Sequence, residues 1–245
     1  MHGAAQKPPS KIYPVSLALG SGTDCNDKYR VRKHHKVCYK SLKEIEGEPS
    51  ILNFWRSKDS YTGISSLSYV TDLTATSVDE GFFEEICSMP NLSSLIMDTV
   101  KVEDLSPLAK LKKLKYLKVV KLKPTKNIEV LTAFPALEKL WIDESKEITD
   151  YSFLSGAKKI VALGVEGDIW TKQKIDTLAP FSNLDNLEAL FLSSVQLKDK
   201  NLDYLASNPR LKHLWCARFA PRKSFESLRK LMPNLDCKWC DNYEV

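Results

Sequence analysis

The sequence contains few residues of the types on which metal sites and catalytic sites depend. It has four histidines and six cysteines in 245 residues, and this cysteine content is too low for a small disulfide-stabilised scaffold. The motifs G-x-S-x-G, H-E-x-x-H, G-x-x-x-x-G-K-[S/T] and G-x-G-x-x-G are all absent, so no motif indicates the nucleophile, zinc or phosphate sites that they mark. We therefore expect a protein that is not an enzyme and that uses no cofactor and no metal ion.

Long hydrophobic runs are also missing, whereas a membrane-spanning helix needs roughly 20 apolar residues. The longest run near the start, Val15–Leu19, is interrupted by Ser16 and preceded by Pro8, Pro9 and Pro14, which makes it a poor core for a secretion signal. We expect no membrane span and a cytoplasmic location.

Charge of either sign is in only small excess. The net charge of +5 is mildly basic and does not by itself indicate a nucleic-acid partner. Hydrophobic residues make up 43% and charged residues 27% of the chain, as in ordinary globular proteins. A chain of this length and composition can bury a sizeable core.

A repeat occupies the last two thirds of the chain. Its unit has apolar residues at the first, fourth and sixth positions, and the eight units begin at residues 70, 92, 114, 137, 160, 187, 211 and 235. Of the 24 apolar positions, 23 hold apolar residues, whereas the overall content of 43% would fill about ten. The exception is Lys238. Such a period is the signature of a solenoid, in which stacked units share one continuous core.

Helix signals separate the units. Proline cannot continue a helix, and four prolines stand two residues before the first position of a unit: Pro90, Pro135, Pro209 and Pro233. Short amphipathic stretches with helical character lie upstream of the units, at residues 81–88, 127–134, 171–178, 199–207 and 223–232. We therefore predict that each unit forms one short strand and one outer helix or extended segment.

This pattern resembles the leucine-rich repeat family over roughly residues 70–240. The segments Asn91–Met97 and Asn208–Cys216 carry the resemblance most clearly. The longer units are similar to the ribonuclease-inhibitor-like class, and the unit around Leu105–Leu111 is similar to the internalin-like class. The resemblance implies an α/β solenoid with a curved parallel sheet on its concave face and short helices on its convex face.

One departure from the family concerns the turn after the strand. Members often have an asparagine there, and the corresponding positions of this chain include Val100, Leu122 and Ser145. The resemblance therefore leaves the geometry of these turns and the curvature open.

The predicted organisation has three parts: a flexible N-terminal segment (residues 1–20), an N-terminal capping region (21–69) and a solenoid of about eight units including a C-terminal cap (70–245). Solenoid ends need polar caps because their apolar faces would otherwise meet water. Lys238 replaces the central leucine of the last unit, which fits a terminal unit with one side in water.

Side chains that point out of the concave sheet are the candidate binding residues. They occupy the third, fifth and seventh positions of each unit, because strand side chains alternate. The fifth positions contain three of the five tryptophans, and solvent-facing aromatic side chains are typical of protein interfaces. The predicted partner-binding residues are Tyr116, Lys118, Lys139, Trp141, Asp143, Phe191, His213, Trp215 and Trp239.

Two alternatives for this aromatic column stay open. Neighbouring rings could stack only to stabilise the sheet, or the C-terminal rings could lie under residues 242–245. Gly164 interrupts the column between Trp141 and Phe191, leaving a dip or a gap.

Two basic segments favour a second class of partner. Residues 24–43 combine seven lysines and arginines with His34 and His35, and residues 110–126 contain eight lysines and no acidic residue. A solvated surface is the simpler interpretation, and binding of nucleic acid or another polyanionic surface is the alternative. A zinc site from Cys25, Cys38 and a histidine is disfavoured, since no close cysteine pair accompanies them.

The pair Cys237 and Cys240 forms a C-x-x-C motif on a predicted strand. A thioredoxin-like motif would open a helix. Cys240 and Cys216 occupy the same apolar position of adjacent units, so we interpret these two cysteines as small buried residues. The leading hypothesis is a non-enzymatic module that binds a protein partner on its concave face, such as an intracellular inhibitor, immunity or adaptor protein. An acidic partner would suit its lysines, and nucleic acid is the less favoured partner.

Overall fold

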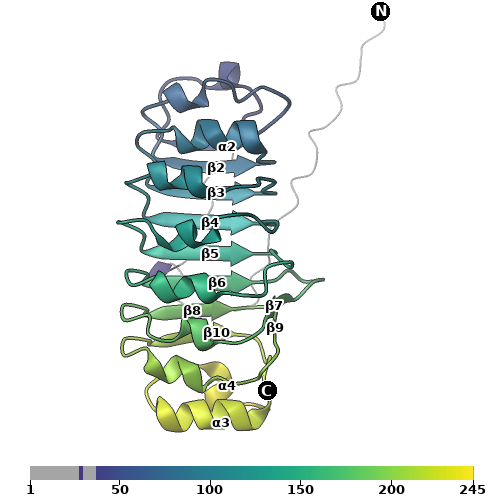
Figure 1. The fold of residues 1–245 in the computed structure, drawn as a ribbon, viewed down its shortest axis with the longest axis vertical. Helices are drawn as coiled ribbons and strands as arrows, with labels where there is room; N and C mark the ends of the chain where they lie inside the picture. Colours follow the sequence, from purple (N-terminus) through teal and green to yellow (C-terminus); the bar gives the residue numbers. More distant parts are fainter. Residues whose placement is uncertain (1–27, 30–36, 245) are drawn as a thin grey trace, which may run out of the picture.

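The structure is a computed structural model, and it describes residues 28–29 and 37–244. Eight strands of this part of the chain form one parallel sheet in the order β1-β2-β3-β4-β5-β6-β8-β10 (Figure 1). Their bounds are β1 Ile51–Trp55, β2 Asp72–Thr76, β3 Ser94–Asp98, β4 Tyr116–Val120, β5 Lys139–Asp143, β6 Ala162–Glu166, β8 Ala189–Leu192 and β10 His213–Cys216. A separate parallel pair consists of β7 (Gln173–Ile175) and β9 (Val195–Leu197).

The strands pair in one register, so that each unit places the same position beside its neighbour. The fourth positions form a ladder of eight leucines: Leu52, Leu73, Leu95, Leu117, Leu140, Leu163, Leu190 and Leu214. Their side chains are between 0% and 3% exposed. A single strand could not bury such a leucine alone, and stacking supplies the missing neighbours. The predicted leucine-rich-repeat solenoid is confirmed.

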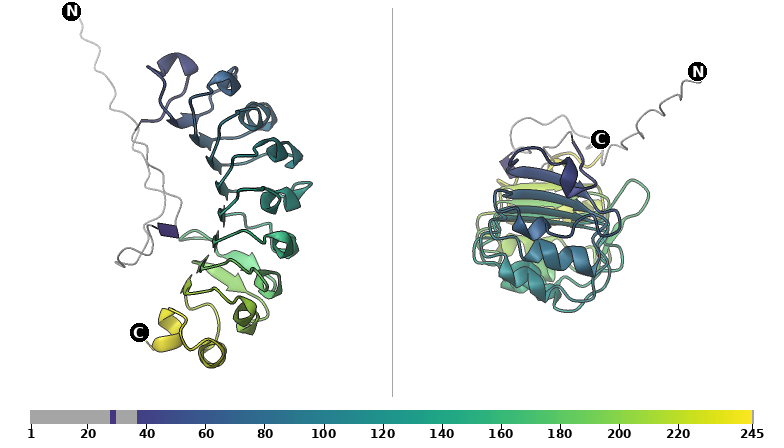
Figure 2. Two further views of the ribbon diagram at one scale, coloured as in Figure 1. Left: turned by 90° about the vertical axis from the view of Figure 1, so that its left-hand side faces the viewer. Right: turned by 90° about the horizontal axis from the view of Figure 1, so that it is seen from above.

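The molecule is curved, with the sheet on the inner side and the helical segments on the outer side (Figure 2). Most outer segments are 3-10 helices: η1 Leu42–Glu44, η2 Ile64–Ser66, η3 Ser106–Lys110, η4 Ile128–Thr132, η5 Ser152–Gly156, η6 Ala179–Phe181 and η7 Asp203–Ser207. The α-helices are α2 (Glu80–Cys87), α3 (Arg222–Leu231) and α4 (Lys238–Asp241). A helix that crosses a bilayer needs more length and more apolar character than any helix in residues 28–29 and 37–244 has.

One predicted helical stretch is wrong. Residues 171–178 contain strand β7, in which Gln173 and Ile175 are buried and Lys174 is exposed. This alternation is that of a strand, and the amide of Gln173 donates hydrogen bonds to the carbonyls of Ser145 and Ile148 at 3.0 and 2.8 Å. The buried amide ties β7 to the preceding turn.

The two ends of the sheet also differ from the prediction. Strand β1 lies in the predicted capping region but pairs with β2 in full register. Its unit starts at Pro49 rather than at an apolar residue, which hides it from the repeat. At the other end, residues 238–241 form helix α4 instead of a strand. Lys238 is exposed there, because a lysine cannot take the buried central place of a unit.

The turns after the strands follow one pattern without the family's asparagine. The eighth position has a left-handed backbone in five units: Ser77, Thr99, Lys121, Glu144 and Ser194. The ninth positions Val100, Leu122 and Ser145 are buried. Ser145 Oγ accepts a hydrogen bond from the Leu122 amide at 3.0 Å, so a serine from the next unit contributes the polar contact of this turn.

Candidate binding surface on the concave face

The predicted aromatic column is in large part not exposed. Trp141 and Phe191 are 2% and 1% exposed, so the expectation that these two rings face open water is wrong. Trp215 is half-buried. Trp239 does not belong to the sheet, because it lies in α4, where its indole Nε1 donates a hydrogen bond to the Cys216 carbonyl at 2.8 Å.

Trp141 is buried because its neighbour in register has no side chain. Gly164 pairs with Trp141 across β5 and β6, and a Cβ at Gly164 would lie 2.0 Å from the indole Nε1. The indole therefore lies across Gly164 and fills the gap predicted there. Its Nε1 donates a hydrogen bond to Glu166 Oε2 at 3.0 Å, so the polar atom of the ring is satisfied.

The rings on β5, β8 and β10 form a continuous stack. The centroids of Trp141 and Phe191 are 5.1 Å apart, and those of Phe191 and Trp215 are 6.3 Å apart with nearly parallel planes. Such pairs stabilise neighbouring strands. The ring-stacking alternative thus accounts for part of the column.

A residue from outside the repeat covers this stack. Tyr29 is 3% exposed and packs in one apolar cluster with Trp141, Ala162, Ala189 and Phe191. Figure 2 shows the short segment 28–29 on the inner side of the curve, beside the strands of the C-terminal half. Ala162 and Ala189 are third positions of adjacent strands, and the ring of Tyr29 fills the space above these two small side chains.

Polar contacts hold Tyr29 and the residue before it. The Tyr29 hydroxyl donates a hydrogen bond to Glu188 Oε2 at 2.7 Å, and Lys139 Nζ donates one to the Lys28 carbonyl at 2.6 Å. Two ammonium groups stand near the same carboxylate, Lys28 Nζ at 3.6 Å and Lys212 Nζ at 3.5 Å from Glu188 Oε2. Five side chains and one backbone carbonyl thus meet around Lys28 and Tyr29.

The acid–base properties of the site follow from these contacts. The hydrogen bond from Tyr29, with the nearby lysines, lowers the pKa of Glu188. Burial and the bond to Glu188 raise the pKa of Tyr29, and burial lowers the pKa of Lys139. Near neutral pH the contact therefore joins a neutral phenol to an ionised carboxylate.

The other predicted residues that belong to the sheet lie on the same face of it as Lys28 and Tyr29, some in contact with them and some farther away. Lys139 Nζ lies 4.8 Å above the ring of Tyr116, and the His213 ring lies 5.7 Å from that of Tyr29. Lys118 and Asp143 form an ion pair whose side chains are 18% and 13% exposed. Tyr116, Lys139, Trp141, Phe191 and His213 are therefore brought together around Lys28 and Tyr29, whereas Trp239 is not.

Sequence reasoning missed Tyr29, Glu188 and the alanine pair. Tyr29 gave no signal because it lies outside the repeat. The alanines did offer one: two small side chains at adjacent concave third positions, Ala162 and Ala189, leave a space that another side chain can fill.

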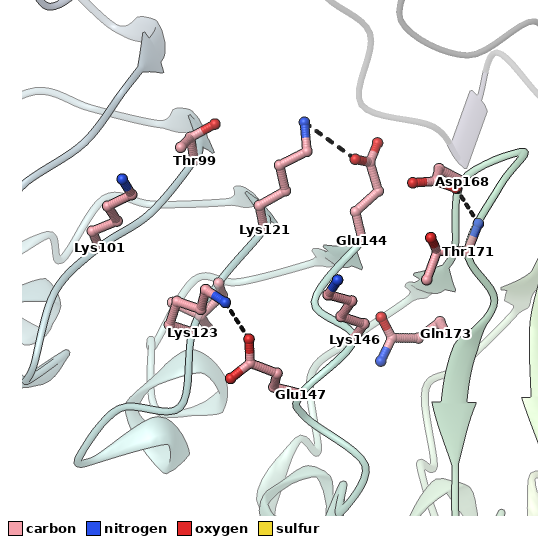
Figure 3. Close-up of a pocket in the computed structure, with 11 residues that line it drawn as sticks. Thr99, Lys101, Lys121, Lys123, Glu144, Lys146, Glu147, Asp168, Thr171 and Gln173 are labelled. Carbon is pink, nitrogen blue, oxygen red and sulfur yellow. Dashed lines mark hydrogen bonds and ion pairs between the residues drawn. The ribbon is translucent and has the colours of Figure 1, made fainter.

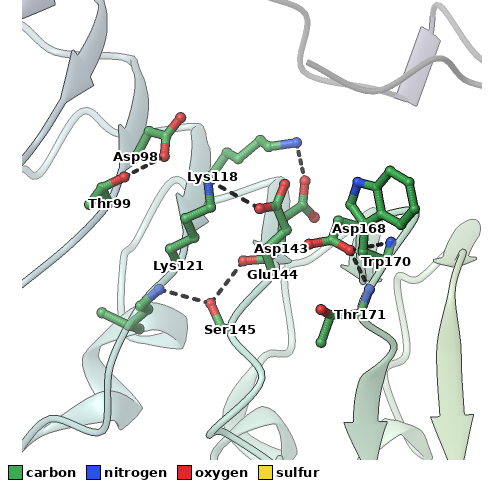
Figure 4. A network of polar contacts seen from close by, with 11 residues as sticks. Asp98, Thr99, Lys118, Lys121, Asp143, Glu144, Ser145, Asp168, Trp170 and Thr171 are labelled. Carbon is green, nitrogen blue, oxygen red and sulfur yellow. Dashed lines mark hydrogen bonds and ion pairs between the residues drawn. The ribbon is translucent and has the colours of Figure 1, made fainter. Parts of the chain in front are cut away.

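A second candidate surface lies at the edge of the sheet where the turns follow the strands. It contains a cavity of about 260 Å³ whose lining includes four lysines and three carboxylates (Figure 3): Lys101, Lys121, Lys123, Lys146, Glu144, Glu147 and Asp168. Lys121 Nζ lies 3.3 Å from Glu144, and Lys123 pairs with Glu147. Two of the four lysines are therefore paired with acids, and Figure 4 shows the pair of Lys121 and Glu144 in its polar network.

The same edge carries an exposed loop. Asp168 Oδ1 accepts hydrogen bonds from the amides of Trp170, at 2.6 Å, and Thr171 (Figure 4). This turn leaves Ile169 77% and Trp170 88% exposed. No other large apolar side chain in the described ranges is as exposed as these two.

The remaining sequence hypotheses concern cysteines and basic residues. Cys25, most of the basic residues of 24–43 and the predicted flexible segment 1–20 lie outside the described residues. Within 28–29 and 37–244, no three His, Cys, Asp or Glu side chains are grouped so as to hold a metal ion. Cys237 stands at the start of helix α4 and not on a strand, which corrects the prediction, and burial raises the pKa of its neighbour Cys216.

Comparison with known proteins finds similarity in fold at low sequence identity. No protein-family model and no curated protein matches this chain. An internalin of Listeria monocytogenes (inlF) is 20% identical with a TM-score of 0.43, over 66% of this chain and 52% of its own. A second internalin (inlC2) of the same organism is 18% identical with a TM-score of 0.40, over 66% of this chain and 80% of its own.

A mouse protein gives a third match. The RP105/MD-1 complex is 16% identical with a TM-score of 0.44, over 82% of this chain and 46% of its own. This chain therefore spans about half the length of the inlF and RP105/MD-1 chains that it matches. At these identities the similarity concerns the fold alone.

Proposed function

We propose that the protein is a non-enzymatic interaction module that binds a protein partner on the C-terminal half of its concave face. One observation carries the proposal: this face already holds a peptide segment, Lys28 and Tyr29, through a buried ring, a hydroxyl bond and a bond to a backbone carbonyl. A surface that satisfies both a side chain and a main-chain atom of an added segment has the chemistry of peptide recognition.

The composition of the surface supports this function. Buried aromatic side chains with a polar surround dominate the binding energy of protein interfaces. Here Trp215 continues the stack beyond Phe191 and remains half-buried, while Lys139, His213 and the Lys118–Asp143 pair border it. A partner of standard size covers about 800 Å² of each surface, which extends well beyond the place taken by two residues.

The proposal includes more specific hypotheses about the role of the protein, the charge of its partner and the organisation of the chain. A cytoplasmic inhibitor, immunity or adaptor protein would use such a module, and Lys139 would orient a partner with acidic groups. The three-part organisation 1–20, 21–69 and 70–245 is kept with one change, since β1 belongs to the sheet.

Polyanion binding through residues 110–126 is the less favoured alternative. Four of the eight lysines already face carboxylates: Lys110 with Glu84, Lys118 with Asp143, Lys121 with Glu144 and Lys123 with Glu147. A phosphate contact at these positions would have to replace an existing ion pair. A partner held by phosphate contacts would lose affinity steeply with salt, and a concave protein contact would not.

The test begins with affinity capture on the full chain and identification of the retained protein by mass spectrometry. The purified partner is then titrated calorimetrically against the wild type, Trp215→Ala and Lys139→Ala. We expect each substitution to weaken binding at least tenfold. The matched control is Lys230→Ala on α3, whose side chain is exposed. Equal affinity of all four proteins would exclude the concave face as the binding surface.

A further inference from the structure

The contact made by Tyr29 identifies what the concave face recognises, provided that the proposed function holds. We propose that Glu188, Ala162 and Ala189 form a tyrosine-binding subsite, that the protein fills it with its own Tyr29, and that a partner binds by replacing Tyr29 with a tyrosine of its own. The ligand class is a protein segment with an exposed tyrosine, preferably preceded by a basic residue.

The shape of the subsite selects an aromatic ring. Ala162 and Ala189 are both fully buried although they are concave positions, because the ring of Tyr29 packs in one cluster with them. Trp141 and Phe191 belong to the same cluster, and the His213 ring stands 5.7 Å away. A planar side chain fills this space, whereas an aliphatic side chain would forgo the contacts between rings.

The hydroxyl contact selects tyrosine over phenylalanine and over phosphotyrosine. An ionised carboxylate only accepts hydrogen bonds, and the Tyr29 hydroxyl supplies a donor to Glu188 at 2.7 Å. Phenylalanine would leave the half-buried carboxylate without this partner. A phosphate group would place like charges together, so phosphorylation of the ligand tyrosine would prevent binding.

The preceding residue is recognised mainly through its backbone. Lys139 Nζ donates to the Lys28 carbonyl at 2.6 Å, and every residue type offers a carbonyl. The Lys28 ammonium is 3.6 Å from Glu188, but its side chain is 68% exposed. Exposed ion pairs contribute little, so a basic residue at this position is a preference and not a requirement.

Self-occupancy makes Tyr29 a competitor of the partner. Only one segment at a time can fill the space beside Ala162 and Ala189, donate to the Glu188 carboxylate and accept from the Lys139 ammonium. When a site is filled in the free protein, the apparent affinity for any other ligand falls in proportion to the fraction that is open. Removing the Tyr29 side chain should therefore tighten the binding of a tyrosine-containing ligand.

The experiment uses a fluorescein-labelled peptide with the sequence of residues 26–32, Asn-Asp-Lys-Tyr-Arg-Val-Arg. Its fluorescence anisotropy is titrated with the full-length wild type and with the full-length Tyr29→Ala variant. We expect the variant to bind at least tenfold more tightly than the wild type. Versions of the peptide with phenylalanine or phosphotyrosine in place of its tyrosine should bind the variant at least tenfold more weakly.

Two further variants serve as controls. Tyr29→Phe retains the ring and should bind the peptide with intermediate affinity, and it keeps the test valid if Tyr29→Ala unfolds. Tyr29→Ala combined with Glu188→Gln should lose the discrimination against the phosphotyrosine peptide, because the repelling charge is gone. Lys230→Ala should bind like the wild type.

The outcomes separate this inference from the proposed function. No peptide binding to Tyr29→Ala, or equal affinity for the phenylalanine peptide, would overturn the tyrosine subsite even if the captured partner still requires Trp215. An unchanged partner affinity in Tyr29→Ala would overturn the replacement step. A wild-type dimer that dissociates on Tyr29→Ala would show that Tyr29 occupies the site of a second copy, which would overturn the intramolecular assignment.

Discussion

The two halves of the concave face share one core and present different surfaces. The leucine ladder runs through both halves in a single register. Above it, β2 and β3 display Thr74, Ser94 and Ile96, which are all buried. Strands β5 to β10 display aromatic rings and two alanines, and Tyr29 from outside the sheet covers them.

This difference shows where specificity can arise in a solenoid. The inward positions are constrained because each leucine must fit between its neighbours. The outward positions meet no such demand, so one pair of alanines or one glycine suffices to build a local site. The following predictions test whether the halves are alike in the core and unlike on the concave surface.

The largest effect is expected in the core, and it should be equal in the two halves. Leu95 and Leu190 are both 0% exposed in the same position of their units. Replacing either with alanine should lower the free energy of unfolding by about 2–5 kcal/mol, through lost burial and the remaining cavity. Urea denaturation of the two variants measures this, and a clear difference between them would contradict a uniform ladder.

The next effect belongs to the C-terminal half. Gly164→Ala places a Cβ 2.0 Å from the Trp141 Nε1 atom, so the indole must leave its place and its bond to Glu166. We expect a loss of about 1–3 kcal/mol and a red-shifted tryptophan emission. Gly156→Ala is the matched control, because its Cβ would meet only Thr132 Oγ1 at 3.8 Å. Similar behaviour of both variants would contradict the packing described.

A smaller effect concerns the ionisation of the covering residue. The raised pKa of Tyr29 means that its contribution to stability is complete below the ordinary pKa of about 10 and is lost as the pH rises through the raised value. The lowered pKa of Glu188 means that its contribution is present above the ordinary carboxyl value and is lost as the pH falls through the lowered one.

Absorbance at 295 nm measures this titration by difference between the wild type and Tyr29→Phe. The phenol that is missing from the variant should ionise above pH 10. An ordinary titration of that phenol would show that Tyr29 is not buried against Glu188.

The smallest effect is expected at the lysine-rich edge. Lys123 and Glu147 are paired, but their side chains are 56% and 43% exposed. Lys123→Ala should change the free energy of unfolding by less than about 0.5 kcal/mol, since exposed ion pairs are solvated and screened. Thermal unfolding at low and high salt checks this, and a loss comparable with that of Gly164→Ala would assign this edge a structural role.

Much of the fold could be predicted from periodicity, and the misses have local reasons. The register of seven strands of the main sheet, β2 to β6 with β8 and β10, follows from the spacing of the leucines. Strand β1 was missed because Pro49 stands where the pattern requires the first apolar residue. Residues 235–240 were predicted as a strand because Leu235 and Cys240 fit the pattern. Lys238, which did not fit it, was the sign that this unit differs. At β7, three residues are too few to distinguish a strand from a helical turn.

The candidate site likewise has one part that the sequence predicts and one part that it does not. Lys139, Trp141, Phe191 and His213 could be placed on the concave face because strand side chains alternate, and alternation is a local property of the chain. Whether those rings are open or covered depends on Tyr29, which is 159 residues away from its partner Glu188. No periodic pattern relates two such positions, since their contact arises from folding in three dimensions, where shape and charge, and not spacing, determine which groups meet.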